Sequence, residues 1–223
     1  MGKLSIVATP IGNLEDITLR ALRTLKECDV IYAEDTRVIS KLLARHEIQK
    51  PLQRLDAATE GVKADDVIAR LEAGERVVYV SDAGTPGISD PGTRLVAQVR
   101  SQLPEAIIEA IPGASALTAA LSISGIDTAA FTFLGFLPHK KGRQTALKLL
   151  AESEIPVVLY ESPHRIEKLL EELKEIEVKH VVIARELTKM HEEIVSGTVE
   201  EIQAHFATHP DAVRGEFVVI VTP

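Results

Sequence analysis

Short apolar runs alternate with longer amphipathic stretches through the first half of the chain. The runs are almost entirely aliphatic, which is typical of strands buried on both faces. They lie at residues 4–8, 30–33, 77–80 and 106–111, and residues 51–55 are a candidate edge strand. Between the runs, apolar residues recur every three or four positions, which predicts helices. This alternation predicts right-handed βαβ units and a parallel sheet.

The first helix is predicted just after the first strand and its loop. Asp16 is placed to cap it, and Leu19, Leu22 and Leu25 fall on one face. Cys28, on the Leu25 side, is expected to pack in the core. A lone cysteine excludes a disulfide within the chain and favours a reducing, cytoplasmic location.

The second half of the chain has a different rhythm, because its apolar runs are separated by shorter connections. These runs lie at residues 131–137, 156–160, 180–184, 192–196 and 217–221. Closely spaced strands of this kind predict a mixed sheet. We therefore expect two α/β domains, residues 1–113 with a parallel sheet and residues 114–223 with a mixed sheet.

Proline, glycine and acidic residues follow the predicted strands of the first half. The richest segment, residues 79–92, reads Tyr-Val-Ser-Asp-Ala-Gly-Thr-Pro-Gly-Ile-Ser-Asp-Pro-Gly. Ligands of open α/β sheets bind beyond the carboxyl ends of the strands, so we expect these segments to form one ligand-binding rim. The simpler alternative is a strand-to-helix turn in which Ser89 or Asp90 caps the next helix.

The net charge of −8, from 25 Lys and Arg against 33 Asp and Glu, makes the chain a poor general binder of phosphate backbones. Contact with nucleic acid would need a local basic patch. The densest basic run is His-Lys-Lys-Gly-Arg at residues 139–143. It is either a phosphate contact at the mouth of the ligand cleft or a solvated helix start, and the unfavourable placement of cations there favours contact.

Several other classes of protein are disfavoured by the sequence. The first loop, residues 9–13, has one glycine and so lacks the dinucleotide fingerprint, and no glycine-rich segment ends in the Gly-Lys-Ser/Thr of a P-loop. His205 and His209 could hold a metal, but no third ligand accompanies them, so we expect a surface pair and no metal. No run of 18 apolar residues predicts a membrane span, and the early first strand leaves no room for a targeting leader.

Seven motifs occur together in a recognisable order and spacing. They are Thr-Pro-Ile-Gly-Asn-Leu (9–14), Ala-Glu-Asp-Thr-Arg (33–37), the 79–92 loop, Ile-Pro-Gly-Ala-Ser (111–115), Gly-Phe-Leu-Pro (135–138), Glu-Ser-Pro-His-Arg (161–165) and Ala-Arg-Glu-Leu-Thr-Lys (184–189). Over essentially its whole length, the chain resembles the bacterial 16S ribosomal RNA cytidine 2′-O-ribose methyltransferase family, which has the tetrapyrrole-methylase fold.

This resemblance implies two α/β domains that bind S-adenosylmethionine in the cleft between them, without a metal, and a homodimer. The implied reaction methylates the ribose 2′-hydroxyl of a cytidine in the decoding region of 16S rRNA. The implied substrate is the assembled 30S subunit, whose shape could offset the acidity of the protein. Members of the family usually continue into a small carboxyl-terminal helical region, whereas this sequence ends at Pro223.

The resemblance also implies the cofactor-binding residues. The loop after the third buried run would cradle the methionine and ribose, main-chain N–H groups at a helix start would bind the carboxylate, and the second domain would line the adenine. For Leu159 and Ala184, the alternative is ordinary strand core. The expected cofactor-binding residues are Pro10, Asp82, Ala83, Gly84, Thr85, Pro86, Ile88, Ser115, Ala116, Leu159, Tyr160 and Ala184.

Removal of the acceptor proton requires a base, and several titratable residues follow the predicted strands. Basic residues beside them could hold RNA phosphates or ease charge at the ribose. For Arg37, Arg185 and Glu186, an ion-pair network between the domains is an equally good interpretation. The catalytic candidates are Glu34, Asp35, Arg37, Glu161, His164, Arg165, Arg185, Glu186 and Lys189.

Two alternative functions fit the sequence less well. One is another enzyme of the same fold that methylates a tetrapyrrole or a modified protein histidine (diphthamide type), which the motifs at 161–165 and 184–189 oppose. The other is a non-catalytic module that binds the methyl donor or the ribosome during assembly.

Overall fold

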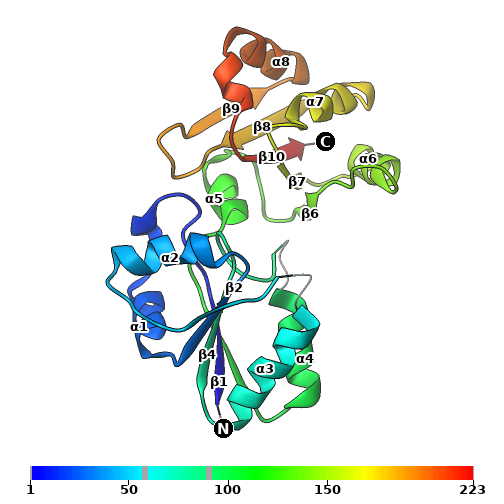
Figure 1. Ribbon diagram of the computed structural model, residues 1–223. Coiled ribbons are helices and arrows are strands. Elements are labelled where there is room, and N and C mark those ends of the chain that lie inside the picture. Colours follow the sequence, from blue (N-terminus) through cyan, green and yellow to red (C-terminus); the bar gives the residue numbers. More distant parts are fainter. Residues whose placement is uncertain (1, 57–59, 89–91, 223) are drawn as a thin grey trace. The chain divides into compact units, whose positions relative to one another are not determined.

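The computed structural model describes residues 2–56, 60–88 and 92–222. The chain divides into two compact units, Met1–Ser115 and Ala116–Pro223. The division falls close to Gly113, where the sequence predicts a domain boundary. Figure 1 shows an α/β arrangement within each unit.

Unit 1 is built on a parallel sheet of five strands in the order β3-β2-β4-β1-β5. Its elements are β1 (Lys3–Val7), a 3-10 turn η1 (Leu14–Asp16), α1 (Leu19–Glu27), β2 (Val30–Ala33), α2 (Thr36–Arg45), β3 (Leu52–Arg54), α3 (Glu60–Glu72), β4 (Arg76–Val80), α4 (Gly92–Gln102) and β5 (Ile107–Ile111). All neighbouring strands pair in parallel, and β3 lies at an edge, as the sequence predicts.

The alternation of side chains along β4 divides the core of unit 1 between the two faces of the sheet. Val78 and Val80 pack with residues of α1 and α2, whereas Val77 and Tyr79 pack with residues of α3 and α4. Both faces are covered, which explains why the central strands are apolar at most positions. Figure 1 shows α1 and α2 on one side of this sheet and α3 and α4 on the other.

The predicted cap of α1 is wrong. Thr18, not Asp16, caps this helix, since its side-chain oxygen accepts from the Ala21 amide. Asp16 instead ends the short η1 turn, and Leu19 is 86% exposed while Ala21 and Leu25 are buried. The shift arises because the chain makes a separate turn, begun by an Asn13 cap, before the helix starts. The predicted Ser89 and Asp90 cap lies outside the described residues.

Unit 2 contains a mixed sheet in the order β6-β7-β10-β8-β9, as predicted. Its elements are α5 (Ala116–Ile123), β6 (Thr132–Phe136), α6 (Arg143–Ala151), β7 (Val157–Glu161), α7 (Ile166–Glu175), β8 (His180–Arg185), β9 (Glu193–Gly197), α8 (Val199–Thr208), a 3-10 turn η2 (Pro210–Val213) and β10 (Phe217–Thr222). Strand β6 pairs with β7 in parallel, and β10 is antiparallel to both β7 and β8. The carboxyl ends of β6, β7 and β8 therefore lie at the same edge.

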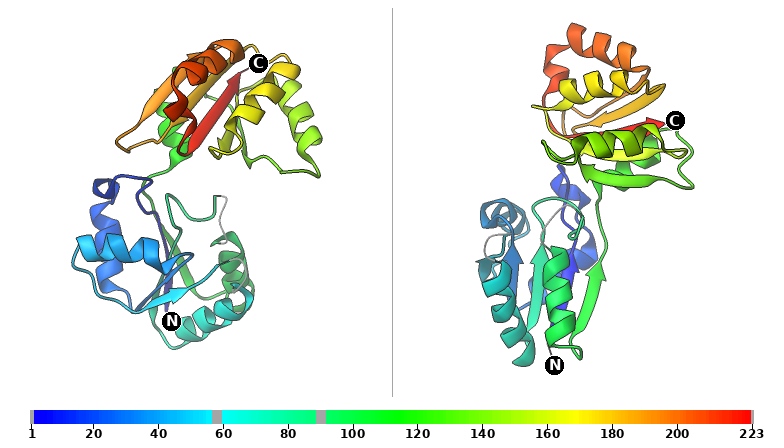
Figure 2. Two further views of the ribbon diagram at one scale, coloured as in Figure 1. Left: turned by 45° about the horizontal axis from the view of Figure 1, so that its top comes forward. Right: turned by 90° about the vertical axis from the view of Figure 1, so that its right-hand side faces the viewer.

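One large apolar cluster joins the sheet of unit 2 to α6, α7 and α8. Alternate strand residues, including Leu159, Ile183 and Val219, pack in this cluster with Leu169 and Ile202 of the helices. The views in Figure 2 show α7 and α8 on one face of this sheet. Apolar side chains are thus buried along the strands of unit 2, and polar side chains lie where the strands end. Within the described residues, none of the helices is long and apolar enough to cross a bilayer.

Cys28 is buried, as predicted, at 2% exposure. Burial is the main reason that the pKa of its thiol rises to about 11. Because thiolate is the reactive form, we predict that Ellman's reagent will modify no thiol in native buffer at pH 8 and one thiol after denaturation. Rapid reaction of the native protein would contradict this placement.

Candidate active site

Two loops at the carboxyl edge of the unit 1 sheet are joined by main-chain pairing. The Thr9 amide donates to the Gly84 carbonyl at 2.9 Å, and the Gly84 amide donates to the Thr9 carbonyl at 3.1 Å. The buried Thr9 side chain also donates to the Ser81 carbonyl at 3.2 Å. The loops after β1 and β4 are therefore fastened to each other. The sequence motifs include Thr9 and Ser81, but their role in joining these loops is visible only in the structure.

The loop after β4 also contacts the segments after β5 and β2. Thr85 donates its hydroxyl hydrogen to the Ala114 carbonyl at 3.1 Å, and Asp82 Oδ1 accepts from the Asp35 amide at 2.8 Å. All four strand ends of the predicted rim thus meet at one edge, which confirms the expectation from the parallel topology. Ser115 directly precedes α5, whose first residue is Ala116.

The backbone conformation at Gly84 explains why glycine occupies the centre of this rim. Its φ is +80°, in the left-handed region. A Cβ there would lie 3.2 Å from Ile11 Cγ2 and 3.5 Å from the Ala114 carbonyl oxygen. Around it, Pro10 and Pro86 are buried, Thr85 and Ile88 are partly exposed, and Ala83 is exposed. The rim therefore combines a tightly packed centre at Gly84 with an exposed residue, Ala83, next to it.

Asp35 and Arg37 form an ion pair within unit 1. Asp35 accepts from the amide and the guanidinium of Arg37, and the shortest of these contacts is 2.5 Å. These hydrogen bonds from Arg37 are the main reason that the pKa of Asp35 falls to about 2. Asp35 also caps α2. Glu34 lies beside it, partly exposed.

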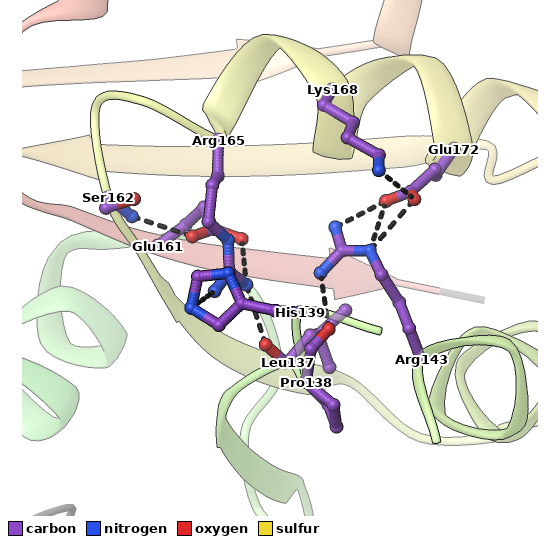
Figure 3. Close-up of polar contacts among 9 residues, drawn as sticks. All are labelled: Leu137, Pro138, His139, Arg143, Glu161, Ser162, Arg165, Lys168 and Glu172. Carbon is purple, nitrogen blue, oxygen red and sulfur yellow. Dashed lines mark hydrogen bonds and ion pairs between the residues drawn. The ribbon is translucent and has the colours of Figure 1, made fainter. Parts of the chain in front are cut away.

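In unit 2, the buried Glu161 and the partly buried Arg165 form an ion pair where β7 ends. The Glu161 side chain is fully buried, and its two oxygens accept from the Ser162 amide at 2.8 Å and from Arg165 at 2.9 Å. Arg165 also donates to the Leu137 carbonyl at 2.7 Å (Figure 3). The intervening His164 is exposed and makes no hydrogen bond or ion pair with any described residue.

The turn after β8 is held by a second polar cluster. Lys189 bridges Glu186 at 2.8 Å and Glu216 at 2.9 Å, and the Glu216 amide donates to Glu186 at 2.9 Å. Glu186 and Thr188 both have positive φ, at 47° and 65°, which is costly for non-glycine residues and especially for a β-branched one. Such conformations persist where neighbouring contacts overdetermine them, as they do here.

Gly215 makes this turn possible. A Cβ at Gly215 would lie 2.4 Å from Cγ of Glu186, so only glycine lets the Glu186 side chain reach its partners. Burial acts to raise the pKa of Glu186, but the hydrogen bonds from Lys189 and the Glu216 amide outweigh it. The pKa of Glu186 therefore lies below its usual value.

Arg185 is paired within unit 2. Its Nε donates to Glu193 at 3.1 Å, and the other carboxylate oxygen of Glu193 contacts His205 at 2.9 Å. The His205 ring stacks on His209, so this histidine pair contacts a carboxylate and its own helix end. Arg37, Arg185 and Glu186 therefore each pair with a residue of their own unit, whereas the alternative interpretation placed such ion pairs between the domains.

The interpretation of residues 139–143 as one exposed basic run is wrong for Arg143. Its side chain is buried and forms a two-pronged ion pair with Glu172 of α7, in which Nε donates at 2.8 Å and 2.9 Å. The signal that could have revealed this lies in α7. Glu172 falls beside Leu169 and Leu173 on the apolar face, and a carboxylate in that position requires a buried cationic partner.

Tyr160 and Leu159 point to opposite faces of the unit 2 sheet. Leu159 is fully buried in the cluster with α6, α7 and α8. Tyr160 contacts Phe133 and Phe136 edge to face and hydrogen-bonds the Leu117 backbone, on the side of α5. Ala184, fully buried, pairs across from Val218, as Tyr160 does. Of the three residues, Tyr160 alone is partly exposed.

Comparison with known proteins defines the class of protein. The model of the family Tetrapyrrole (Corrin/Porphyrin) Methylases matches residues 3–203. Solved structures agree in fold. A diphthine synthase superposes with a TM-score of 0.76 at 16% identity, covering 99% of this chain and 90% of that one. A uroporphyrin-III C-methyltransferase from Thermus thermophilus, complexed with S-adenosyl homocysteine, gives 0.66 at 20% identity, covering 99% and 97%.

Curated relatives narrow the assignment. "Ribosomal RNA small subunit methyltransferase I" of Thermotoga maritima is 44% identical, with 100% of this chain and 99% of that protein covered. The proteins of the same name from Neisseria meningitidis serogroup B and Xylella fastidiosa are 43% and 45% identical, with 100% and 99% of this chain and 76% and 81% of those proteins covered. The chain belongs to this ribosomal RNA small subunit methyltransferase I family of tetrapyrrole methylases.

We predict that Gly84→Ala will lower the free energy of unfolding by about 1–2 kcal/mol, because alanine is strained at positive φ. Urea denaturation measures the change. Gly61→Ala is the matched control, since a Cβ at Gly61 in α3 meets no atom within 4 Å. The control should be neutral or stabilising. Equal effects of the two substitutions would contradict the conformational argument.

The lowered pKa of Glu186 predicts a pH-dependent stability. A depressed folded pKa means that ionised Glu186 stabilises the protein above the unfolded pKa, and that this contribution is lost as the pH falls through the folded pKa. Glu186→Gln should therefore lower the melting temperature at neutral pH, and the difference from wild type should shrink well below pH 4.5. The exposed Glu171→Gln variant serves as the control. A pH-independent deficit in Glu186→Gln would argue against the ion-pair explanation.

Proposed function

We propose that the protein transfers the methyl group of S-adenosylmethionine to the ribose 2′-hydroxyl of a cytidine in the 16S rRNA of the small ribosomal subunit. The observation that carries this proposal is the 43–45% identity to proteins named ribosomal RNA small subunit methyltransferase I, which extends over essentially the whole chain. Similarity to solved structures below 25% identity supports only the fold. The cytidine and the 2′-oxygen come from the motif resemblance.

The unit 1 rim has the chemistry to bind the methyl donor. Its exposed residue Ala83 presents main-chain groups to a ligand, and Asp82 is oriented by the Asp35 amide. Carboxylate and carbonyl oxygens suit a ribose diol, and amides at the start of α5 after Ser115 suit a carboxylate. When bound, the donor supplies a methyl group on a positively charged sulfur. From unit 2, we assign adenine contacts to Tyr160 and to the backbone of Leu159 and Ala184.

The protein must bring the acceptor oxygen to about 3 Å from the methyl carbon and remove a proton. Among the catalytic candidates, Asp35, Glu161 and Glu186 already accept hydrogen bonds from cationic partners. Their lone pairs are therefore poorly placed to accept a proton. His164 is exposed at the same strand edge as Glu161, and histidine is the side chain that most often acts as a general base. We assign the base to His164.

The basic candidates divide by what already binds them. Arg165, Arg185 and Lys189 each hold a carboxylate and one or more main-chain carbonyls or a second carboxylate, which fits positioning of the strand ends. Arg37 also pairs with a carboxylate, that of Asp35, but 88% of its side chain is accessible, so we assign to it a contact with RNA phosphate. We also propose that the enzyme acts as a homodimer in the cytoplasm.

A methyl-transfer assay tests this function. Purified protein, tritiated S-adenosylmethionine and 30S subunits from a strain that lacks the corresponding gene should yield labelled 16S rRNA. A 2′-O-methyl group blocks alkaline cleavage at its nucleotide, so one alkali-resistant dinucleotide should carry the label. Transfer to a porphyrinogen or to a protein would support another enzyme of the fold. Donor binding without transfer to any of these would support the assembly module.

We predict that His164→Ala will lower kcat for 30S subunits by about 100-fold or more, because removal of a general base typically has this effect. Affinity for S-adenosylhomocysteine, measured by calorimetry, should not change. His180→Ala is the control, since His180 lies at the amino end of β8, whereas His164 follows the carboxyl end of β7 in the same sheet. A His164→Ala variant with wild-type kcat would reassign the base and leave the methyl-transfer proposal standing.

A further inference from the structure

Two arginines, the buried Arg143 and the partly buried Arg165, fasten the segment between β6 and α6. Arg165 donates to the Leu137 carbonyl at 2.7 Å, and Arg143 donates to the carbonyl of the next residue, Pro138, at 3.2 Å. Arg165 Nη1 also lies 3.2 Å from Nε2 of His139. Since a guanidinium only donates, this ring nitrogen accepts. Three consecutive residues are thus held by two side chains, as Figure 3 shows.

Each of these arginines is neutralised by its own carboxylate. Glu161, with a fully buried side chain, pairs with Arg165, and Glu172 pairs with Arg143 through a two-pronged contact. Lys168 also approaches Glu172 at 3.9 Å. The two guanidinium charges are therefore compensated inside the protein. Neither arginine is available to a ligand outside.

Unlike the two arginines, Lys140 and Lys141 neither hold the segment in place nor have a carboxylate that compensates their charge. Both are exposed, and neither side chain forms a hydrogen bond or ion pair with any described residue. They also precede the amino terminus of α6, where cations are mildly unfavourable, so they do not stabilise the fold. The result is a pair of uncompensated cations on a segment whose backbone is fixed by buried contacts, in a chain with a net charge of −8.

A fixed pair of cations binds a polyanion at lower entropic cost than a mobile pair does. The segment lies at the carboxyl edge of the unit 2 sheet, as do His164 and the turn after β8. We propose that Lys140 and Lys141 contact the phosphate backbone of the RNA substrate, and that the Arg143–Glu172 pair positions them. This inference rests on the proposed function and adds to it the surface that binds the RNA.

The double substitution Lys140→Ala/Lys141→Ala tests the contact. Affinity for 30S subunits, measured by sedimentation, should fall about tenfold, and the slope of log affinity against log salt should become shallower by about 1 to 2, since each lysine releases about one counterion. Melting temperature and affinity for S-adenosylhomocysteine should not fall. Lys179→Ala is the control, because Lys179 is exposed at the opposite edge of the same sheet. It should leave the affinity and the slope unchanged.

The substitution Arg143→Met/Glu172→Met tests the positioning role. Replacing both partners removes the fastening of Pro138 without leaving a buried charge unpaired. KM for 30S subunits should rise several-fold while kcat stays near wild type. In the Lys140→Ala/Lys141→Ala background the same change should have little further effect, because both act through one contact. Additive effects, or a loss of kcat instead of a rise in KM, would overturn the positioning role.

The outcomes separate this inference from the proposed function. If the wild type methylates 30S subunits and the lysine double variant binds them with wild-type affinity and salt slope, the RNA contact is overturned and the function stands. If the wild type neither binds nor methylates 30S subunits, both are overturned. Weakened 30S binding by the lysine variant, with Lys179→Ala unchanged, supports the inference.

Discussion

The pairing of Thr9 with Gly84 is the contact on which the rim of unit 1 depends. Two main-chain hydrogen bonds join the loops after β1 and β4, and contacts from Thr85 and Asp82 add the segments after β5 and β2. The left-handed backbone at Gly84 makes this close approach possible. A parallel sheet brings its strand ends to one edge, and these hydrogen bonds turn that edge into a single surface.

In unit 2, contacts of side chains hold the strand ends in place. Its strand ends are fixed by ion pairs, Glu161 with Arg165 and Glu186 with Lys189, and by the fastening of Leu137 and Pro138. Ion pairs that are wholly or partly removed from water contribute little net stability, because desolvation offsets much of the attraction. Their effect here is to fix geometry. The charges of these pairs compensate one another, whereas His164, Lys140 and Lys141 are exposed at the carboxyl ends of the unit 2 strands.

The strands and the parallel and mixed sheets could be predicted from the sequence, because apolar runs and strand-helix alternation are strong local signals. The cap of a helix and the partner of a charged side chain were harder to predict. The cap of α1 moved from Asp16 to Thr18 through an additional turn, and Arg143 is buried because Glu172, 29 residues away, reaches it. The Thr18 cap is a local contact that the additional turn displaces from the predicted position, whereas the Arg143–Glu172 pair is a tertiary contact, of which the local pattern shows only the carboxylate on the apolar face of α7. The meeting of the strand ends in one rim could be predicted from the topology. The cationic partner of each carboxylate could not.

The proposed methyl transfer depends most directly on binding of the methyl donor at the rim of unit 1. Amide hydrogen exchange of the full chain, with and without saturating S-adenosylhomocysteine, tests this directly. Slower exchange in the loops at residues 9–14, 82–88 and 113–116 is the predicted result. Saturation without protection in these three segments, or protection confined to other parts of the chain, would contradict the account.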